Sequence, residues 1–208
     1  MKRFWLLGVW MLLSALPSFA QQIMYSGLKE LMENSGDTVT TLKVEKRSKN
    51  QIYLTGGADY RIEAEENPGL CKYLKSRCYA VQIDTVLYVN CRKMRYKHYR
   101  FGGWYAPAMW VRGKIYYCAQ PVGQVATSTA APADATKLGG EVGDAIAASG
   151  LVHARVYYEL DPETGKSIFV GKDRMKELLD GEPALQEKLL KETSESATVI
   201  GKYLRQLK

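Results

Sequence analysis

CYAVQIDTVLYVNC, the stretch from Cys78 to Cys91, contains a clear strand pattern. Tyr79–Ile83 and Val86–Asn90 are rich in aromatic and β-branched residues, and Asp84-Thr85 separates them. This pattern predicts a β-hairpin with a two-residue loop. In that register Cys78 lies directly opposite Cys91 at a non-hydrogen-bonded pair, where the two chains are close enough for a cross-strand disulfide.

The first 20 residues have the pattern of a secretory signal peptide. Lys2-Arg3 gives a positive start, Phe4–Leu16 is almost entirely apolar, and Ser18-Phe19-Ala20 offers small residues to signal peptidase. A permanent membrane anchor is the alternative, but the apolar run is shorter than the roughly 20 residues that span a bilayer, and Pro17 interrupts it. We therefore expect cleavage after residue 20 and an exported protein that is periplasmic, outer-membrane-associated or extracellular.

Export to an oxidising compartment gives the cysteines a structural role. An even number of cysteines there predicts two disulfides, for which three connectivities exist. We expect Cys78–Cys91 together with Cys71–Cys118, and a local Cys71–Cys78 link is the alternative. Their spacings include neither the close ligand pairs of a zinc site nor the C-x-x-C of a thiol-disulfide enzyme, so the sequence predicts no metal and no cofactor.

Composition divides the chain into four segments. Residues 1–20 are the signal peptide, 21–120 an α+β domain, 121–150 an Ala-, Thr-, Pro- and Gly-rich linker or insertion, and 151–208 a hairpin plus a helical segment. The predicted fold class is α+β, with an antiparallel or mixed sheet and short helices in the N-terminal part, and a β-hairpin followed by two or three helices in the C-terminal part.

Local patterns place the individual elements. In the N-terminal part we expect a helix capped by Ser26, strands over Thr38–Glu45, Gln51–Thr55, Asp59–Ala64 and Lys114–Ala119, and a short helix started by Asn67-Pro68. In the C-terminal part we expect strands over Ala154–Leu160 and Ser167–Val170, and helices around Met175–Leu179, Ala184–Lys191 and Ala197–Leu207.

A basic and aromatic run follows the first hairpin. The formal net charge of the chain is +7, and the excess of Lys and Arg lies in residues 21–120. Arg92–Arg100, RKMRYKHYR, would be charged on both faces if extended, which predicts an edge strand or an exposed loop. The candidate binding residues are Arg92, Arg95, Lys97, Arg100, Trp104, Tyr105 and Trp110.

Such residues can hold phosphate, carboxylate or sulfate groups, while the aromatic rings stack on a sugar or lie at a lipid headgroup layer. The expected partner is therefore an anionic glycan, lipopolysaccharide or a membrane surface. In the alternative interpretation the charges protect a sheet edge and the aromatic residues fill the core. Nucleic acid is a common partner of basic, aromatic surfaces, but export makes it a poor candidate here.

The layout resembles a family of uncharacterised exported proteins from Bacteroidales bacteria. The resemblance rests on LTGGADYRI at Leu54–Ile62, YVNCRK at Tyr88–Lys93, FGGWYAPA at Phe101–Ala108, and a VYYELDPETGK hairpin after a Gly- and Ala-rich segment. It covers most of the chain after the signal peptide. The resemblance implies an envelope or secreted location and no particular activity.

Enzyme motifs are absent from the sequence. Neither His98 nor His153 has a nucleophile or metal-ligand motif around it, and GxSxG, HExxH and EF-hand patterns do not occur. The acidic run Glu63, Glu65 and Glu66 is better explained as a solvated loop than as a catalytic pair. We therefore predict a non-catalytic exported envelope protein without catalytic residues. The alternatives are a structural or assembly component that acts through an envelope protein partner and, second, a carbohydrate-active hydrolase.

Overall fold

The computed structural model describes residues 21–65, 67–130 and 150–208. The predicted signal peptide and most of the predicted linker lie outside these residues. The predicted α+β class is confirmed, and every strand pairing is antiparallel. Among the helices described, none is long and apolar enough to cross a bilayer.

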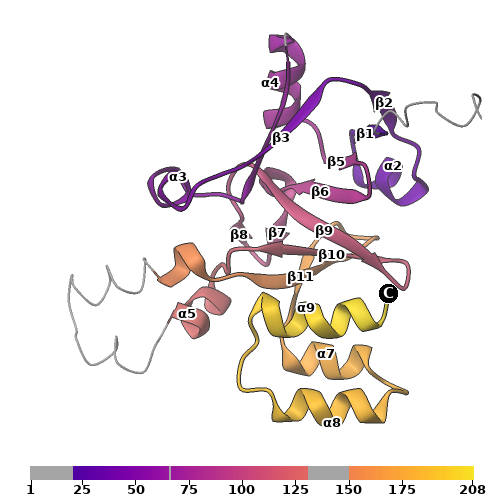
Figure 1. Ribbon diagram of the computed structural model, residues 1–208, viewed down its shortest axis with the longest axis vertical. Coiled ribbons are helices and arrows are strands. Elements are labelled where there is room, and N and C mark those ends of the chain that lie inside the picture. The colour runs from indigo at the N-terminus through magenta and orange to yellow at the C-terminus, as the bar shows by residue number, and fades with distance from the viewer. Residues whose placement is uncertain (1–20, 66, 131–149) are drawn as a thin grey trace, which may run out of the picture.

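One large antiparallel sheet contains strands from both the N-terminal and the C-terminal parts of the chain (Figure 1). Its strands follow the order β12-β11-β10-β9-β6-β5-β1-β2, and the β3–β4 hairpin joins it where Tyr60 of β4 pairs with Tyr105 of β9. The strands are β1 Gln22–Tyr25, β2 Asp37–Val39, β3 Leu42–Lys46, β4 Tyr60–Ala64, β5 Ala80–Ile83, β6 Val86–Asn90, β9 Tyr105–Val111, β10 Lys114–Ala119, β11 Val156–Leu160 and β12 Ser167–Val170. Because β10 pairs with β11, the segments on either side of the predicted linker share this sheet.

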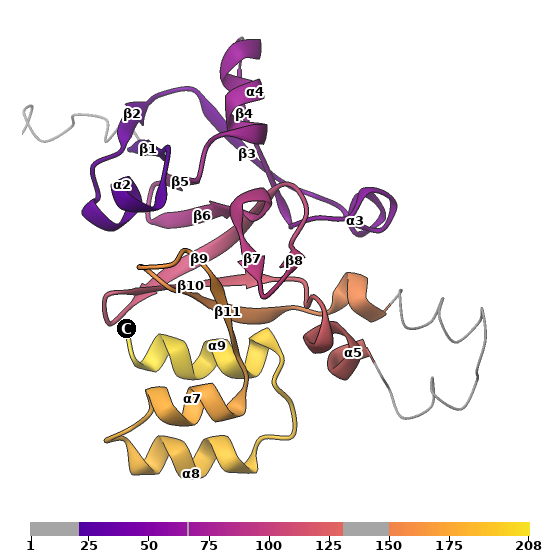
Figure 2. The same ribbon diagram turned by 180° about the vertical axis from the view of Figure 1, so that it is seen from behind.

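The helices lie at separate places around the sheet. They are α2 Leu28–Glu33, α3 Lys49–Thr55, α4 Pro68–Ser76, α5 Gln124–Ala130, α7 Lys172–Leu178, α8 Pro183–Lys191 and α9 Ala197–Gln206, with a 3-10 turn, η1, at Cys91–Lys93. Figures 1 and 2 show α7, α8 and α9 stacked together at one end of the molecule, and α3 projecting from its side. A core cluster that includes Tyr116, Tyr157 and Met175 packs these three C-terminal helices against the sheet.

Elements with strong local signals lie where the sequence predicts them. In the β5–β6 hairpin Ile83 pairs with Val86, which confirms the two-residue loop. The Asn67 side chain accepts a hydrogen bond from the Leu70 amide and caps α4. Asp161 likewise accepts bonds from two amides in the turn between β11 and β12.

The prediction of a strand over Gln51–Thr55 is wrong, because these residues belong to α3. Ser48 and Gln51 form a reciprocal capping box, with each side chain bonded to the backbone amide of the other residue. Ile52 is the one residue of this short helix that is buried. The helix predicted to be capped by Ser26 also differs, because Gly27 is its N-cap and Ser26 instead bonds the Glu30 carboxylate.

The four cysteines are free thiols in the structure, so the predicted disulfides are absent from it. The regular β5–β6 pairing ends at Ala80 and Val89. The Asn90 amide still donates a 2.9 Å hydrogen bond to the Tyr79 carbonyl, but the chain then turns into η1 at Cys91. Cys78 packs in the core cluster under β3 and β4, whereas Cys91 starts η1 and packs in the cluster with Tyr117 and Tyr158. Cys71 and Cys118 also contact different clusters.

β9 is a central strand that the sequence analysis did not predict. Its C-terminal residues pair with β10, and Leu87–Asn90 of β6 pair with its other edge. Proline lacks the amide hydrogen that a central strand needs, and Pro107 pairs only with Tyr88 of β6. The β9–β10 ladder accordingly ends at Ala108, the residue directly after the proline.

Candidate functional site

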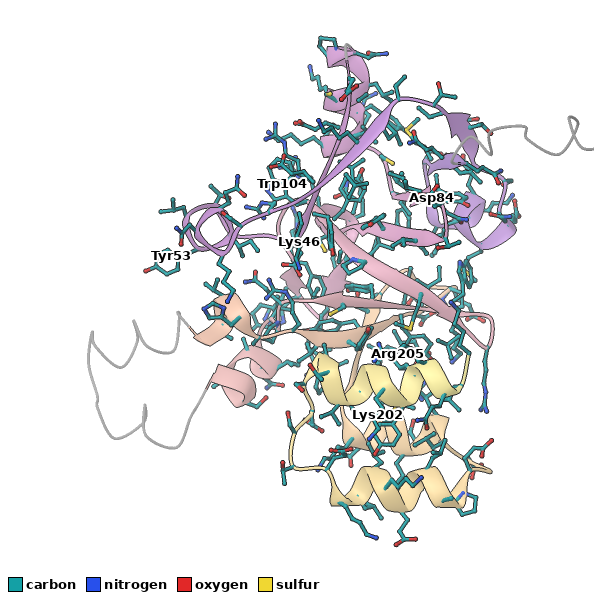
Figure 3. The ribbon with its side chains drawn as sticks, viewed as in Figure 1. Lys46, Tyr53, Asp84, Trp104, Lys202 and Arg205 are labelled. Atoms are coloured by element: carbon teal, nitrogen blue, oxygen red, sulfur yellow. The ribbon has the colours of Figure 1, made fainter. Side chains whose placement is uncertain are left out.

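Trp104 lies in a small pocket at the start of β9. The pocket has a volume of about 180 Å³. We call it the indole pocket, and its lining residues are Glu45, Arg47, Gln51, Thr55, Arg61 and Trp104. Figure 3 shows Trp104 on the body of the molecule beside the base of α3. The strand β3, the helix α3 and the strand β4 thus each contribute side chains to one surface around the indole.

Close backbone packing holds Trp104 in place. Trp104 has a φ of 72°, in the left-handed region that non-glycine residues rarely adopt. The Ala58 amide donates a hydrogen bond of 2.9 Å to the Gly103 carbonyl. A Cβ on Gly57 would lie 2.6 Å from that same carbonyl oxygen, and Gly57 itself has a φ of 82°. The contact therefore requires glycine at position 57, and the unusual backbone at Trp104 is fixed by its neighbours.

Arg47 supports the other side of the pocket. Its guanidinium donates hydrogen bonds to the carbonyls of Gly56, Ala58 and Gln51 at 2.7–3.1 Å, and also to the Thr55 hydroxyl. These acceptors lie in and directly after α3, so the side chain fixes the helix to the sheet. Burial lowers the pKa of Arg47, while nearby Asp59 opposes that shift. All four acceptors are neutral, so no carboxylate bonded to the guanidinium cancels its charge.

Three cations surround the indole ring. The Arg47 and Arg61 guanidinium carbons lie 5.1 and 5.6 Å from the ring centroid, and the Lys75 ammonium lies 5.8 Å from it. These distances are within the range of cation–π attraction. Arg61 also forms an ion pair with Glu63, but its Nε is buried and has no hydrogen-bond partner in the described part of the chain. The pocket thus combines an aromatic surface, positive charge and an unused N–H donor.

A second basic surface lies on the chain just before Trp104. We call it the basic hairpin, and its cations are Arg92, Lys93, Arg95, Lys97 and Arg100. Arg92 and Lys93 lie on η1, and Lys97 lies in the turn between the strands β7 Arg95–Tyr96 and β8 Tyr99–Arg100, which hold the other two cations. These two strands pair with each other and not with the large sheet. All five are exposed, and within the described residues none of them forms an ion pair. The hairpin is therefore not an edge of the main sheet.

Buried residues on either side fix the basic hairpin to the body. Met94 is completely buried before β7, and Phe101 packs edge-on against Tyr158 after β8, with ring centroids 4.7 Å apart. The Tyr99 ring lies so close to Gly123 that a Cβ there would be 2.3 Å from it. The Lys97 ammonium also donates a hydrogen bond to Gln124. The cations consequently project from a supported turn.

The predicted aromatic group is divided by the fold. Trp104 directly precedes β9 and Trp110 lies near the end of that strand, about 20 Å away at the usual rise of a strand. Tyr105 is buried, and its hydroxyl donates a 2.8 Å hydrogen bond to the Leu74 carbonyl. Trp110 is half-buried and lines a separate pocket of about 130 Å³ with neighbours that include Met109 and Lys208. Of the three rings, only Trp104 lies among cations in a pocket.

The residues considered for catalysis are dispersed. His98 stacks on Tyr99 at the tip of the basic hairpin, and His153 is exposed elsewhere. Glu63 is paired with Arg61 and Glu65 with Lys43, whereas Glu66 lies outside the described residues. In residues 21–65, 67–130 and 150–208, no three His, Cys, Asp or Glu side chains are grouped as metal ligands.

The cations of the indole pocket were missed by the sequence analysis. Arg47 lies between β3 and α3, Arg61 in β4 and Lys75 in α4, and only the tertiary fold brings the three to Trp104. One local signal was available, because Ser48 and Gln51 have the spacing of a capping box and predict a helix beside Arg47.

Fold and site together define an α+β protein with one large antiparallel sheet and an aromatic pocket surrounded by cations. A comparison with protein families is more specific: the chain belongs to the Family of unknown function (DUF6563), whose match covers residues 23–208. The match includes both basic surfaces and the C-terminal helices. No curated protein and no solved structure matches the chain.

Proposed function

We propose that the protein is a non-catalytic, exported envelope protein that binds an anionic glycan or lipid headgroup at the indole pocket. The observation that carries this proposal is the position of Trp104 among Arg47, Arg61 and Lys75. A ligand with an acidic group beside a sugar ring can pair its charge with Arg61 and lay its ring against the indole.

The dimensions of the site favour a single ring or headgroup. Its volume of about 180 Å³ is below the roughly 300–1,000 Å³ typical of sites for drug-sized ligands. The basic hairpin follows Trp104 closely in the chain, since only Phe101–Gly103 separate it from the indole. Its unpaired cations can hold further acidic groups of a longer glycan or of lipopolysaccharide. Export is supported by the pattern of residues 1–20 and by the resemblance to exported proteins.

Binding to soluble anionic glycans tests the proposal. The protein used is Gln21–Lys208, because the apolar Phe4–Leu16 would itself bind lipopolysaccharide and vesicles. The described sheet and its core clusters lie within residues 21–208, so this chain contains the fold. The probes are a heparin-derived tetrasaccharide and lipopolysaccharide, measured by calorimetry at about 0.15 M salt, where weak surface attraction is already screened.

Three variants separate the two surfaces. Trp104→Leu and Arg61→Gln change the pocket, and the quadruple variant R92E/R95E/K97E/R100E reverses the charge of the basic hairpin. A matched control, K176E/K188E, reverses two exposed lysines on the C-terminal helices that form no described ion pair.

We expect Arg61→Gln to bind the tetrasaccharide at least roughly tenfold more weakly, since a hydrogen bond to a charged group contributes roughly 1.5–3 kcal/mol. Trp104→Leu should also bind it more weakly, because the sugar ring loses the aromatic surface against which it lies. The hairpin variant should lose affinity and salt dependence together, and the control should bind like the wild type. Wild-type affinity in both pocket variants, or no binding by the wild type, would refute the proposal. Far-ultraviolet circular dichroism confirms that each variant is folded.

A further inference from the structure

The helix α3 exposes two large apolar side chains that are consecutive in the chain. Tyr53 is 62% and Leu54 78% exposed, and of the large apolar side chains described only Leu190 reaches a similar value, 65%. Figure 1 shows α3 projecting from the body, and Figure 3 shows Tyr53 pointing outward from it. An exposed leucine alone is ordinary, but two adjacent apolar residues on a projecting helix form a defined contact point.

The charge around this point is positive. Lys46 ends β3 just before α3, and Lys49 lies one helical turn before Tyr53 on the same face of the helix. Both lysines are exposed, and neither has a hydrogen bond or ion pair to a carboxylate within the described chain. Arg47 lies between them, and Glu45 is the acidic residue of this short stretch.

The support of α3 makes it a stiff projection. The capping box of Ser48 and Gln51 closes its first turn, and the hydrogen bonds from Arg47 fix its last turn to the sheet. Ile52 is buried beneath the helix. Tyr53 and Leu54 are consequently held outside the body of the protein. Binding through them costs little conformational entropy, because the helix that carries them is already ordered.

We propose that α3 is a membrane-contact element that docks the protein on a bilayer with anionic headgroups. Tyr53 and Leu54 enter the boundary between headgroups and acyl chains, and Lys46 and Lys49 contact the phosphates around them. An aromatic and an aliphatic side chain flanked by lysines have the chemistry of a membrane interface. The inference rests on the proposed function in one respect: the indole pocket lies beside the docking point, so a headgroup of the bilayer would be the anionic ligand that the pocket binds.

Vesicle co-sedimentation tests this inference with residues 21–208 and vesicles of phosphatidylcholine with or without phosphatidylglycerol. The variant Y53S/L54S removes the apolar contact and keeps every charge, whereas K46Q/K49Q removes two charges and keeps the apolar contact. Leu190→Ser is the matched apolar control, since α8 lies at a different end of the molecule from α3 (Figure 1). K176Q/K188Q is the matched charge control.

We expect wild-type binding only to the anionic vesicles. Y53S/L54S should bind at least roughly tenfold more weakly, and K46Q/K49Q should lose roughly fivefold for each lysine. Both controls should bind like the wild type. All substituted side chains are exposed, so the variants should unfold at nearly the wild-type temperature.

Two results would overturn the inference: no wild-type binding to anionic vesicles, or equal binding by Y53S/L54S. A change in the sedimentation mass of Y53S/L54S without vesicles would show that α3 mediates self-association instead. The proposed function is tested by a different result, because it predicts that Y53S/L54S binds the tetrasaccharide as strongly as the wild type does. Loss of tetrasaccharide binding in the pocket variants with intact vesicle docking would support docking through α3 and overturn the headgroup as the ligand of the indole pocket.

Discussion

Replacing Glu159 by glutamine should destabilise the protein without changing its shape. Glu159 lies on β11 and is 2% exposed, beneath the C-terminal helices. Its carboxylate accepts hydrogen bonds from the Arg174 guanidinium of α7 at 2.9–3.1 Å and from the Lys114 ammonium of β10 at 2.7 Å. The Tyr116 hydroxyl also donates to it, at 3.5 Å. One buried anion thus joins a helix to two strands of the sheet.

The expected magnitude follows from the exposure of the partners. Removing one member of a fully buried ion pair costs about 3–5 kcal/mol. Here the side chains of Arg174 and Lys114 are 28% and 41% exposed, so water can solvate the charges that remain. The amide of glutamine also accepts a weaker hydrogen bond. We therefore expect Glu159→Gln to lower the free energy of unfolding by about 2–3 kcal/mol.

Urea denaturation at pH 7, followed by tryptophan fluorescence, measures this change. The midpoint should fall while the dependence on urea concentration stays the same, because the buried surface does not change. Glu187→Gln is the control, since Glu187 forms an exposed pair with Lys191 one helical turn away. Such pairs contribute only about 0.3–0.5 kcal/mol. If Glu159→Gln changed stability as little as the control, the carboxylate would not anchor α7 as described.

Three further predictions concern the thiols and the backbone near Trp104. The four cysteines are free, so protein denatured without a reductant should take up four alkyl groups from iodoacetamide, counted by mass spectrometry. Uptake of fewer groups would show that the protein contains disulfides after all. Burial raises the pKa of Cys78 to about 11 and that of Cys118 to about 12. As the pH rises, the thiols of the unfolded protein lose their protons first. The free energy of unfolding, measured by urea titration, should therefore fall from about pH 9 to 11 by about 1.4 kcal/mol per pH unit for each thiol. A flat profile, or an unchanged slope in Cys118→Ala, would contradict this. Gly57→Ala places a Cβ against the Gly103 carbonyl at a φ of 82° and should cost about 2 kcal/mol and weaken tetrasaccharide binding. Gly69→Ala in α4 has room for the methyl group and should cost nothing, and similar thermal melting of the two variants would refute the close contact.

The sequence predicts those elements whose signals are local. The β5–β6 hairpin, the Asn67 cap and the β11–β12 turn each depend on residues that are close in the chain, and each is confirmed. The strand predicted over Gln51–Thr55 is wrong because the prediction rests on the apolar residues alone, whereas the capping box of Ser48 and Gln51 begins a helix there. β9 was missed because Pro107 and the glycines before it are unusual in a central strand.

The candidate site could be predicted only in part. The sequence indicates that Arg92–Arg100 is basic and exposed, and the structure confirms that exposure for all five cations. It identifies Trp104 as a candidate but contains no local signal that joins Trp104 to Arg61 or Lys75, which lie on other elements. It also groups Tyr105 with Trp104, although alternation along β9 turns the Tyr105 ring into the core.

The strand order has a consequence for the time course of folding. β5 with β6, β9 with β10 and β11 with β12 are pairs of strands joined by short turns, so each of these hairpins can form early with little loss of chain entropy. β1 instead lies between β2 and β5, and its Gln22 must find Ile83 far along the chain. Contacts between distant residues slow folding. We expect the N-terminal strand to dock last, so that a nascent or partly unfolded molecule exposes the edge of β5 until the first residues of the sheet arrive.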